Sequence, residues 1–153
     1  MPAPRNAGDF RKPNLFDWIS NEMFGVMVAL GLGLPHNYLL FVRGRKTGRL
    51  RFTPVNLLDF RGKRYLVAGR GRTQWVRNAE AAGEIGLLKY WMRQKCKIRP
   101  VPNGEKPEIL KACLERYWLT VQRYFPVRAG SEPAAFAALA DRYPVFELFP
   151  VGR

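Results

Sequence analysis

The sequence is poor in the side chains that most often hold metals or carry acid–base catalysis. It has two cysteines, Cys96 and Cys113, and a single histidine, His36. The cysteines form no C-x-x-C pair and have no histidine nearby in the sequence, so the spacing of a zinc site and of a disulfide framework is absent. We therefore expect reduced thiols, no metal and a cytoplasmic protein.

Acidic residues are also scarce. Twelve Asp and Glu residues stand against 26 Lys and Arg residues, which gives a formal net charge of +14. Such a charge favours an anionic partner, which can be nucleic acid, an anionic lipid surface or a polyanionic small molecule. Hydrophobic residues at 47% and aromatic residues at 13% exclude a disordered chain, so the cations belong to a folded protein.

The common nucleotide-binding fingerprints are missing. The loop Gly69 to Arg72 is rich in glycine and arginine, but Gln74 stands where a dinucleotide fingerprint needs its third glycine. The segment Gly44 to Gly48 lacks the Walker spacing. A basic nucleic-acid-binding domain stays open as an alternative, although the aromatic residues are not interleaved along a strand as in RNA-binding domains.

Long apolar runs are absent too. The run Met23 to Leu34 is too short to span a bilayer, and acidic residues precede it, unlike in a signal peptide. We expect it to end an amphipathic helix that starts at Leu15 and caps the core, with peripheral membrane association or a non-catalytic lipid carrier as alternatives. Residues 1–14 hold three prolines and no apolar periodicity, which predicts a flexible arm before one domain at residues 15–153.

The most distinctive stretch is Arg43 to Arg51, in which five of nine residues are cations. It lies between two strand-like runs and predicts a basic hairpin. Gly44 and Gly48 allow positive φ and close backbone approach, so N–H groups, the Thr47 hydroxyl and guanidinium groups can converge on one anion. A phosphate-bearing ligand is one interpretation, and a solvated hairpin without a ligand is the other.

A second cationic loop, Gly69 to Arg72, precedes a helix-competent segment from Thr73 to Ala82. Thr73 is a candidate N-cap residue, and Gly83 ends the segment. A helix N-terminus that follows arginines attracts anions. The two loops together therefore favour a ligand with more than one negative group.

Hydrophobic periodicity and turn residues predict the other elements. Strands are predicted at Asn37–Arg43, Leu50–Phe60, Arg64–Gly69, Ile85–Arg93, Lys95–Val101 and Pro144–Leu148, with a turn around Gln94, and helices at Glu108–Tyr124 and Glu132–Leu139. Hairpin-length connections favour an α+β fold, mainly an antiparallel closed or half-closed barrel flanked by helices. Pro54 cannot donate to a ladder, which predicts an edge, a bulge or a ligand-facing position there.

Several of these segments together resemble the deazaflavin-dependent nitroreductase and quinone reductase family. They are Gly44-Arg45-Lys46-Thr47-Gly48-Arg49 followed by Arg51 and Pro54-Val55, then Val67-Ala68, Trp75-Val76-Arg77-Asn78 with Ala81-Ala82-Gly83, and Tyr143-Pro144-Val145-Phe146. The resemblance runs from about Tyr38 to the C-terminus. It implies an FMN-binding-like split β-barrel and bound coenzyme F420, a deazaflavin with a phosphodiester and an anionic polyglutamate tail.

The resemblance also implies a set of cofactor-binding residues. Arg45, Lys46 and Thr47 would hold the phosphate, and Arg51, Phe52, Thr53, Pro54, Val55 and Asn56 would line the deazaflavin ring. Ala68, Gly69 and Arg70 would form a second contact loop, and Gln74, Trp75, Val76, Arg77 and Asn78 would open the helix that completes the pocket, with Trp75 against the cofactor.

The implied activity is hydride transfer from reduced coenzyme F420 to a hydrophobic acceptor, which can be a quinone, an activated alkene or a nitro compound. A reduced deazaflavin carries its own hydride, so the protein needs only to bind, orient and exclude water. Tyr117 is a candidate proton donor or acceptor-pocket residue, although its companions Thr120 and Arg123 depart from the tyrosine cluster of some family members. An FMN or FAD enzyme of the same fold is the alternative, and a homodimer is a further expectation.

Overall fold

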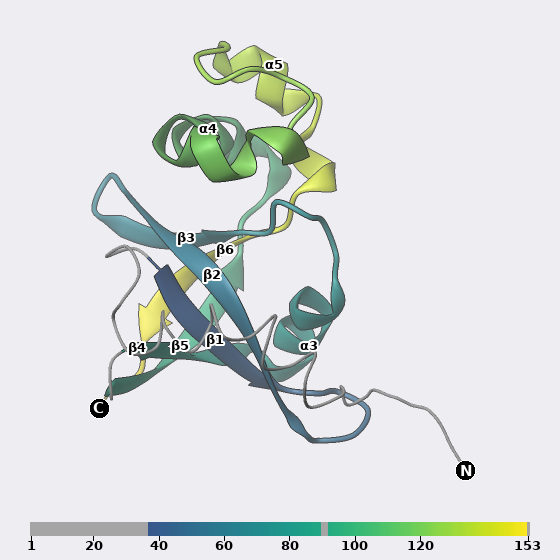
Figure 1. Cartoon of the computed structure of the whole chain (residues 1–153), viewed down its shortest axis with the longest axis vertical. Coiled ribbons are helices and arrows are strands. Elements are labelled where there is room, and N and C mark those ends of the chain that lie inside the picture. Colours follow the sequence, from purple (N-terminus) through teal and green to yellow (C-terminus); the bar gives the residue numbers. More distant parts are fainter. Residues whose placement is uncertain (1–36, 90–91, 153) are drawn as a thin grey trace.

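Six strands close into an antiparallel barrel in the order β1-β2-β3-β6-β5-β4 (Figure 1). The structure is a computed structural model that describes residues 37–89 and 92–152. The strands are β1 (Asn37–Arg43), β2 (Leu50–Phe60), β3 (Lys63–Val67), β4 (Glu84–Lys89), β5 (Met92–Pro100) and β6 (Val145–Pro150). The helices are α3 (Gln74–Ala82), α4 (Lys106–Val121) and α5 (Pro133–Ala137), with short 3₁₀ turns η1 (Asn103–Glu105), η2 (Gln122–Tyr124) and η3 (Ala140–Arg142).

The predicted antiparallel barrel with flanking helices is confirmed. The arm at residues 1–14 and the helix from Leu15 to Leu34 lie outside the described residues. The turn predicted around Gln94 is wrong, because Gln94 lies inside β5 and pairs with Leu87 of β4. The nine residues of β5 run on through this position since β5 pairs with β4 along one edge and with β6 along the other.

The period-two alternation of the strands creates two apolar layers. Leu57 and Leu66 belong to the cluster that also contains the buried face of α3. Their neighbours Leu58 and Tyr65 belong to the second cluster, which includes residues of α4 and α5. Both faces of this part of the sheet are therefore covered, and Figure 1 shows α4 and α5 stacked beyond β2 and β3.

Strand β2 changes its partner along its length. Residues Leu50 to Asn56 pair with β1, whereas Leu57 to Phe60 pair with β3. In the described part of the chain, the other edge of the first segment has no strand beside it. Helix α3 packs against β1 and β4. The barrel is consequently split along the first half of β2, where Pro54 lies.

Candidate functional site

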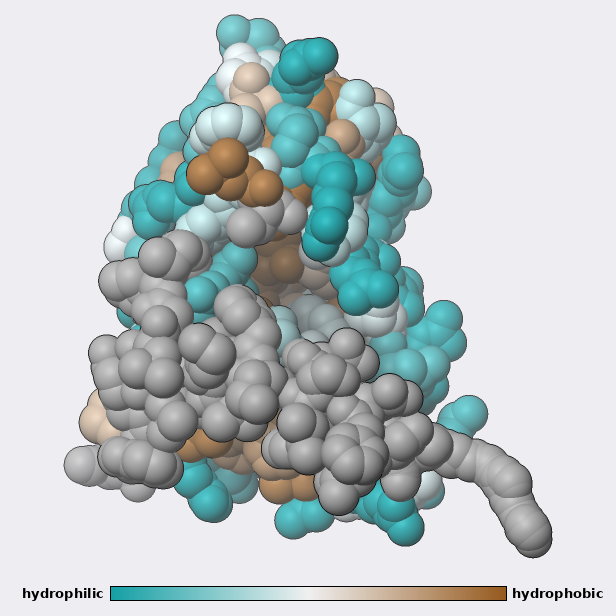
Figure 2. Space-filling view, in the orientation of Figure 1, coloured by the Kyte–Doolittle hydropathy of each residue, from teal (hydrophilic) through white to brown (hydrophobic). Residues whose placement is uncertain are grey.

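The split beside β2 forms a groove of about 1380 Å³. One wall is the segment of β2 from Arg51 to Asn56, and the β1–β2 turn closes one end. The loop after β3 and the start of α3 contribute a second wall, and the C-terminal part of α4 with η2 borders the other end. Figure 2 shows this face of the molecule hollowed below α4, with apolar side chains at the floor of the hollow.

The β1–β2 turn is held by its own backbone. The Gly44 N–H donates to Arg49 O at 2.7 Å, and the Gly48 N–H donates to Gly44 O at 2.8 Å. Gly48 has φ +75, which disfavours other residues there. The Arg49 N–H donates to Thr47 Oγ1 at 3.2 Å. Three of the six N–H groups from Gly44 to Arg49 are thus engaged inside the turn, which leaves fewer backbone amides to a ligand and gives the side chains a larger part in binding.

Arg45 ties this turn to α3. Its backbone N–H donates to Asn78 Oδ1 at 3.0 Å, and its Nη1 donates to the same oxygen at 2.8 Å. The Arg45 Nη1 also donates to Gln74 Oε1 at 3.0 Å. Asn78 is only 5% exposed, so its amide is a fixed anchor. Two segments that are far apart in the sequence are thereby joined at the mouth of the groove.

The groove is strongly cationic. Among its described lining residues are five cations, Arg45, Lys46, Arg51, Arg70 and Arg123, and no aspartate or glutamate. By contrast, Arg72 lies outside this lining and forms an ion pair with Glu80 at 2.5 Å. Because the described lining has cations and no acidic side chains, the groove is a favourable site for an anionic ligand.

The start of α3 supplies a hydroxyl to the same wall. Thr73 occupies the N-cap position, as predicted, and its side chain makes no capping hydrogen bond. Its Oγ1 is buried and has no hydrogen-bond partner within the described part of the chain. Thr73 lines the groove. Because a buried hydroxyl is costly to leave unpaired, this oxygen is suited to a ligand's polar group.

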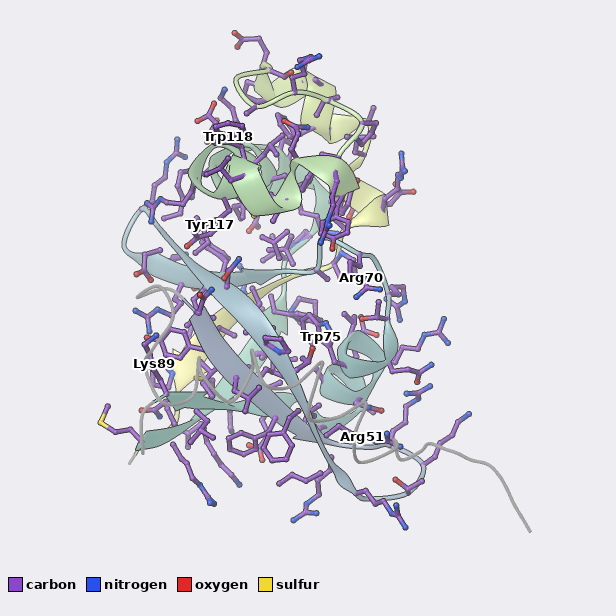
Figure 3. The ribbon with its side chains drawn as sticks, in the orientation of Figure 1. Arg51, Arg70, Trp75, Lys89, Tyr117 and Trp118 are labelled. Carbon is purple, nitrogen blue, oxygen red and sulfur yellow. The ribbon has the colours of Figure 1, made fainter. Side chains whose placement is uncertain are left out.

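The middle of the groove is apolar. Trp75 packs against Phe146 of β6 with ring centroids 6.2 Å apart, and both Trp75 and Pro54 line the groove. In Figure 3 the Trp75 side chain lies between the strands and α3. A planar ring can therefore be accommodated between cationic ends.

Tyr117 comes from an irregular point of α4, where its φ of −121 and ψ of 29 depart from helical values. The side chain is buried, and its hydroxyl donates to the Leu57 carbonyl oxygen of β2. Burial raises the pKa of Tyr117 above its ordinary value, so the phenol is neutral at physiological pH. The next residue, Trp118, is 52% exposed and points away from the groove (Figure 3).

The groove brings together nearly all the predicted site residues. Arg45, Lys46, Thr47, Arg51, Phe52, Thr53, Pro54, Val55, Asn56, Ala68, Gly69, Arg70, Gln74, Trp75, Asn78 and Tyr117 line it. Val76 and Arg77 do not, because Val76 is fully buried among the barrel residues and Arg77 points to solvent.

Several lining residues were not among the predicted cofactor-binding residues. They are Asn37, Gly44, Leu58, Val67, Gly71, Thr73, Cys113, Val121, Arg123 and Tyr124. Asn37 could have been found from the hairpin register, which pairs it with Asn56, and the two side-chain amides are hydrogen-bonded. The residues of α4 and η2 carried no comparable signal, because their position depends on tertiary packing.

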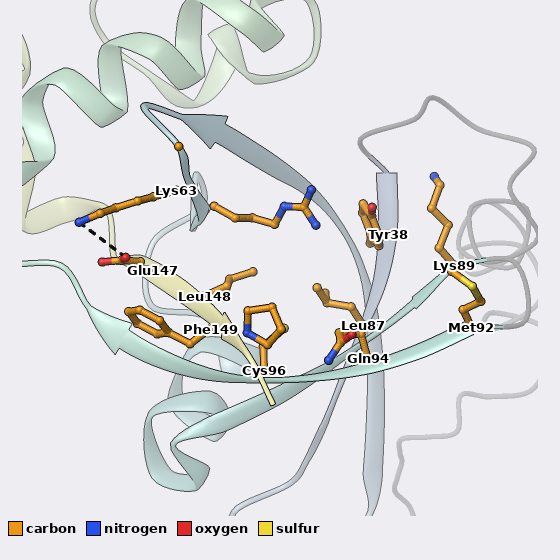
Figure 4. Close-up of a pocket in the computed structure, with 13 residues that line it drawn as sticks. Tyr38, Lys63, Leu87, Lys89, Met92, Gln94, Cys96, Glu147, Leu148 and Phe149 are labelled. Carbon is orange, nitrogen blue, oxygen red and sulfur yellow. Dashed lines mark ion pairs between the residues drawn. The ribbon is translucent and has the colours of Figure 1, made fainter. Parts of the chain in front are cut away.

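A smaller cavity of about 560 Å³ lies where β1 and β3 begin and β4 and β6 end (Figure 4). None of the predicted site residues lines it. Its buried carboxylate, Glu147, is paired with Arg99 at 2.8 Å and with Lys63 at 3.8 Å. Burial also lowers the pKa of Lys89 in its wall. In the part of the chain that is described, no group of His, Cys, Asp and Glu residues could hold a metal ion.

Comparison with known proteins decides the family. A family model for the F420H(2)-dependent quinone reductases matches residues 15–127. The chain belongs to this family. It is therefore an oxidoreductase that uses coenzyme F420, and the predicted F420-dependent reductase function and the predicted cofactor are confirmed. No curated protein matched the chain.

Solved structures of low sequence identity are similar to this chain in fold. A structure described as the F420-H2 dependent reductase FDR-A is 19% identical, with a TM-score of 0.49 and coverage of 74% of this chain and 94% of that chain. One described as a domain-swapped dimer is 18% identical, with a TM-score of 0.50 and coverage of 87% and 98%. HutZ, the heme storage protein from Vibrio cholerae, is 9% identical, with a TM-score of 0.53 and coverage of 93% and 91%.

Within residues 37–89 and 92–152, none of the helices is long and apolar enough to cross a membrane.

Proposed function

We propose that the groove beside β2 is the site where this quinone reductase binds coenzyme F420 and its electron acceptor together. The observation that carries the proposal is the lining itself, with five cations, no carboxylate among the described lining residues, and an apolar centre. A deazaflavin ring needs the apolar centre, and a phosphodiester needs the cations.

The hairpin end is the proposed phosphate site. Lys46 and Arg51 line it and form no ion pair or hydrogen bond with another described side chain, so they are available to an anion. Arg45 is held by Gln74 and Asn78 through Nη1, which leaves its other guanidinium donors for the ligand. The buried Thr73 hydroxyl is a neutral donor on the opposite wall.

The ring is proposed to lie in the apolar centre, between Pro54 and Trp75. When bound in reduced form, coenzyme F420 supplies the hydride. The chain contributes binding, orientation and exclusion of water, which is sufficient because a hydride donor needs no acid–base dyad in the protein. The quinone takes up the hydride and one proton, which solvent provides through the open groove, and becomes a hydroquinone. Tyr117 is proposed to shape the acceptor side as a neutral phenol, since its hydroxyl is hydrogen-bonded to the Leu57 carbonyl oxygen.

The test is a fluorescence titration of the protein with oxidised coenzyme F420, run in parallel with FMN. Micromolar binding of the deazaflavin is expected, and Lys46→Ala should weaken it by about 1–3 kcal/mol, as for the loss of a charge-assisted contact. Lys97→Ala is the matched control, because Lys97 is exposed on β5 and does not line the groove. An affinity that both variants leave unchanged would place the phosphate elsewhere.

A second copy of the chain is a proposed partner. A solved structure of this fold is described as a domain-swapped dimer. Helix α4 also leaves Trp118 and Leu119 exposed by 52% and 80%, which is unusual for large apolar side chains. Light scattering of the purified protein tests this, with a dimer mass expected and a monomer mass at all concentrations as the contrary result.

A further inference from the structure

The end of the groove farthest from the hairpin carries a cation of its own. Arg123 of η2 lines this end with Tyr117, Val121 and Tyr124. Its Nη2 donates to the Tyr124 hydroxyl at 3.0 Å, and its Cζ lies 5.0 Å from the centroid of the Tyr124 ring. These two contacts hold the guanidinium beside an aromatic face.

The platform under Arg123 is fixed on both sides. A Cβ built on Gly69 would lie 3.6 Å from the Tyr124 ring, so the loop after β3 packs directly against this ring. The Tyr124 carbonyl oxygen accepts a hydrogen bond from the Tyr143 hydroxyl. Tyr124 is thus anchored between the loop and the chain segment before β6, and Arg123 is presented from a defined position.

Arg123 has no carboxylate partner in the part of the chain that the structure describes. Its guanidinium has five donors in a fork that matches a carboxylate or sulfonate. In the described part of the chain, one hydrogen bond to a neutral phenol and the packing on the same ring engage it. An aromatic wall with an uncompensated guanidinium recognises a planar ring that bears an anionic substituent.

We propose that Arg123 makes this enzyme selective for electron acceptors that are anionic quinones, in which the quinonoid ring carries a carboxylate or a sulfonate. The inference rests on the proposed function, because it takes the hairpin end of the groove as the coenzyme's place and leaves the Arg123 end for the acceptor. The electron count is unchanged by the substituent. The quinone gains a hydride from the reduced coenzyme and a proton from water, the coenzyme is oxidised, and the anionic group only binds.

The experiment compares two acceptors with reduced coenzyme F420 as the donor. The acceptors are 1,4-naphthoquinone and its 2-sulfonate, and the measured quantity is the ratio of their kcat/KM values. Differences in intrinsic reactivity cancel when this ratio is compared between variants. Arg123→Gln should lower the preference for the sulfonate by about 10- to 100-fold, as for one charge-assisted pair. Arg123→Lys should retain part of it, because the charge remains.

Arg128→Gln is the matched control, since Arg128 is an exposed arginine five residues later that does not line the groove. A binding readout without turnover is a calorimetric titration with 2-naphthoate, whose affinity Arg123→Gln should weaken while Arg128→Gln does not. An unchanged ratio in Arg123→Gln, or an equal fall in Arg128→Gln, overturns the proposal.

The affinity for coenzyme F420 distinguishes a failure of the proposed function from a failure of the proposed role of Arg123. If the wild-type protein fails to bind coenzyme F420, the proposed function is wrong. If it binds and Arg123→Gln leaves both the affinity and the acceptor ratio unchanged, the Arg123 proposal alone is wrong. If the Arg123→Gln variant loses coenzyme affinity by as much as it loses acceptor preference, Arg123 holds the coenzyme, which also overturns the proposal.

Discussion

Arg45 and Lys46 are neighbours in the sequence, yet their surroundings in the structure differ. The Arg45 guanidinium is held by Asn78 and Gln74 of α3, whereas Lys46 has no such partner within the described residues. Arg45 therefore fixes the position of the turn, and Lys46 is the cation that the turn offers to a ligand. The anchor for this arrangement is a single buried amide, Asn78.

We expect Asn78→Ala to weaken the binding of coenzyme F420 by about 1–3 kcal/mol, because it removes the acceptor of two hydrogen bonds, one of them from a charged group. The phosphate-free deazaflavin riboside should lose much less affinity, since the hairpin contributes little to its binding. Fluorescence titrations with both ligands measure the difference. Arg77→Ala, on the same helix but outside the groove lining, serves as the control. Equal losses for both ligands would mean that Asn78 supports the whole pocket and not the hairpin alone.

The buried thiol of Cys113 leads us to expect a loss of stability at alkaline pH. Burial in α4 raises the pKa of this thiol from its ordinary value of 9.0 to about 12. The thiol of the unfolded chain therefore loses its proton at a lower pH than the thiol of the folded chain. The free energy of unfolding is unaffected by this group below about pH 9 and falls as the pH rises from 9 toward 12. By pH 10 the loss from this group amounts to about 1.4 kcal/mol, the value of one pH unit.

Denaturant unfolding at pH 8 and pH 10 measures this loss of stability. The Cys113→Ala variant should lose less stability between the two pH values, because the thiol is gone. The control is Cys96→Ala, since burial raises the pKa of Cys96 in the same direction but without so large a shift. A pH dependence that Cys113→Ala leaves intact would assign the loss to other groups, such as Tyr117 and Tyr143, whose pKa values burial also raises.

At the scale of elements, β4 depends on a glycine for its pairing with β1. Gly86 pairs with Phe41, and a Cβ at Gly86 would lie 2.1 Å from Phe41 Cζ. The Phe41 ring covers the glycine and also packs against Phe52, with ring centroids 5.9 Å apart. The ring thus occupies the space that a side chain at Gly86 would need.

We expect Gly86→Ala to lower the free energy of unfolding by about 1–3 kcal/mol through overpacking. Phe41→Leu in the same chain should recover part of this loss by vacating the space. Gly104→Ala is the control, because nothing lies within 4 Å of a Cβ built there. Chemical denaturation provides the comparison, and a Gly86→Ala protein as stable as the control would show that the Phe41 ring moves aside at no cost.

The elements that sequence predicted well are those with local signals. The basic hairpin, both of its strands and the helix after the second loop follow from turn residues and periodicity in Arg43–Arg51 and Thr73–Ala82. The course of β5 through Gln94 did not follow, because the alternation of basic and apolar residues fits either one strand or a strand and a turn. The partner change within β2 depends on long-range register, and no local pattern encodes it.

The same division holds for the site. Four of the five lining cations and Trp75 were predicted because family motifs mark them, and the groove gathers them. Some N–H groups of the turn are already bonded within the protein, such as that of Arg45, which donates to Asn78 of α3. No sequence motif predicts which N–H groups are engaged in this way. Arg123 and Tyr124 reach the groove only through the packing of α4 and η2.

At the scale of the whole molecule, the charge of +14 acts on how fast an anionic ligand arrives. We expect the association rate of coenzyme F420 to fall by roughly a factor of ten when salt is raised from about 20 mM to about 500 mM, since salt shortens the range of the field. Stopped-flow fluorescence measures this rate. The deazaflavin riboside, which lacks the phosphate and the glutamate tail, is the control and should show a much smaller fall in rate. A salt effect of the same size for both ligands would argue against steering by charge.

The change of partner within β2 has a consequence for how the protein behaves in a crowded solution. A strand edge without a neighbour is a template on which another chain can add a strand, which leads to aggregation. Here the segment Leu50 to Asn56 carries Pro54, which has no N–H to donate, and the charged Arg51. The residues that would receive the coenzyme thus also protect this edge of β2 from pairing with other molecules, and we expect a substitution of Pro54 chosen to alter catalysis to lower the solubility of the protein.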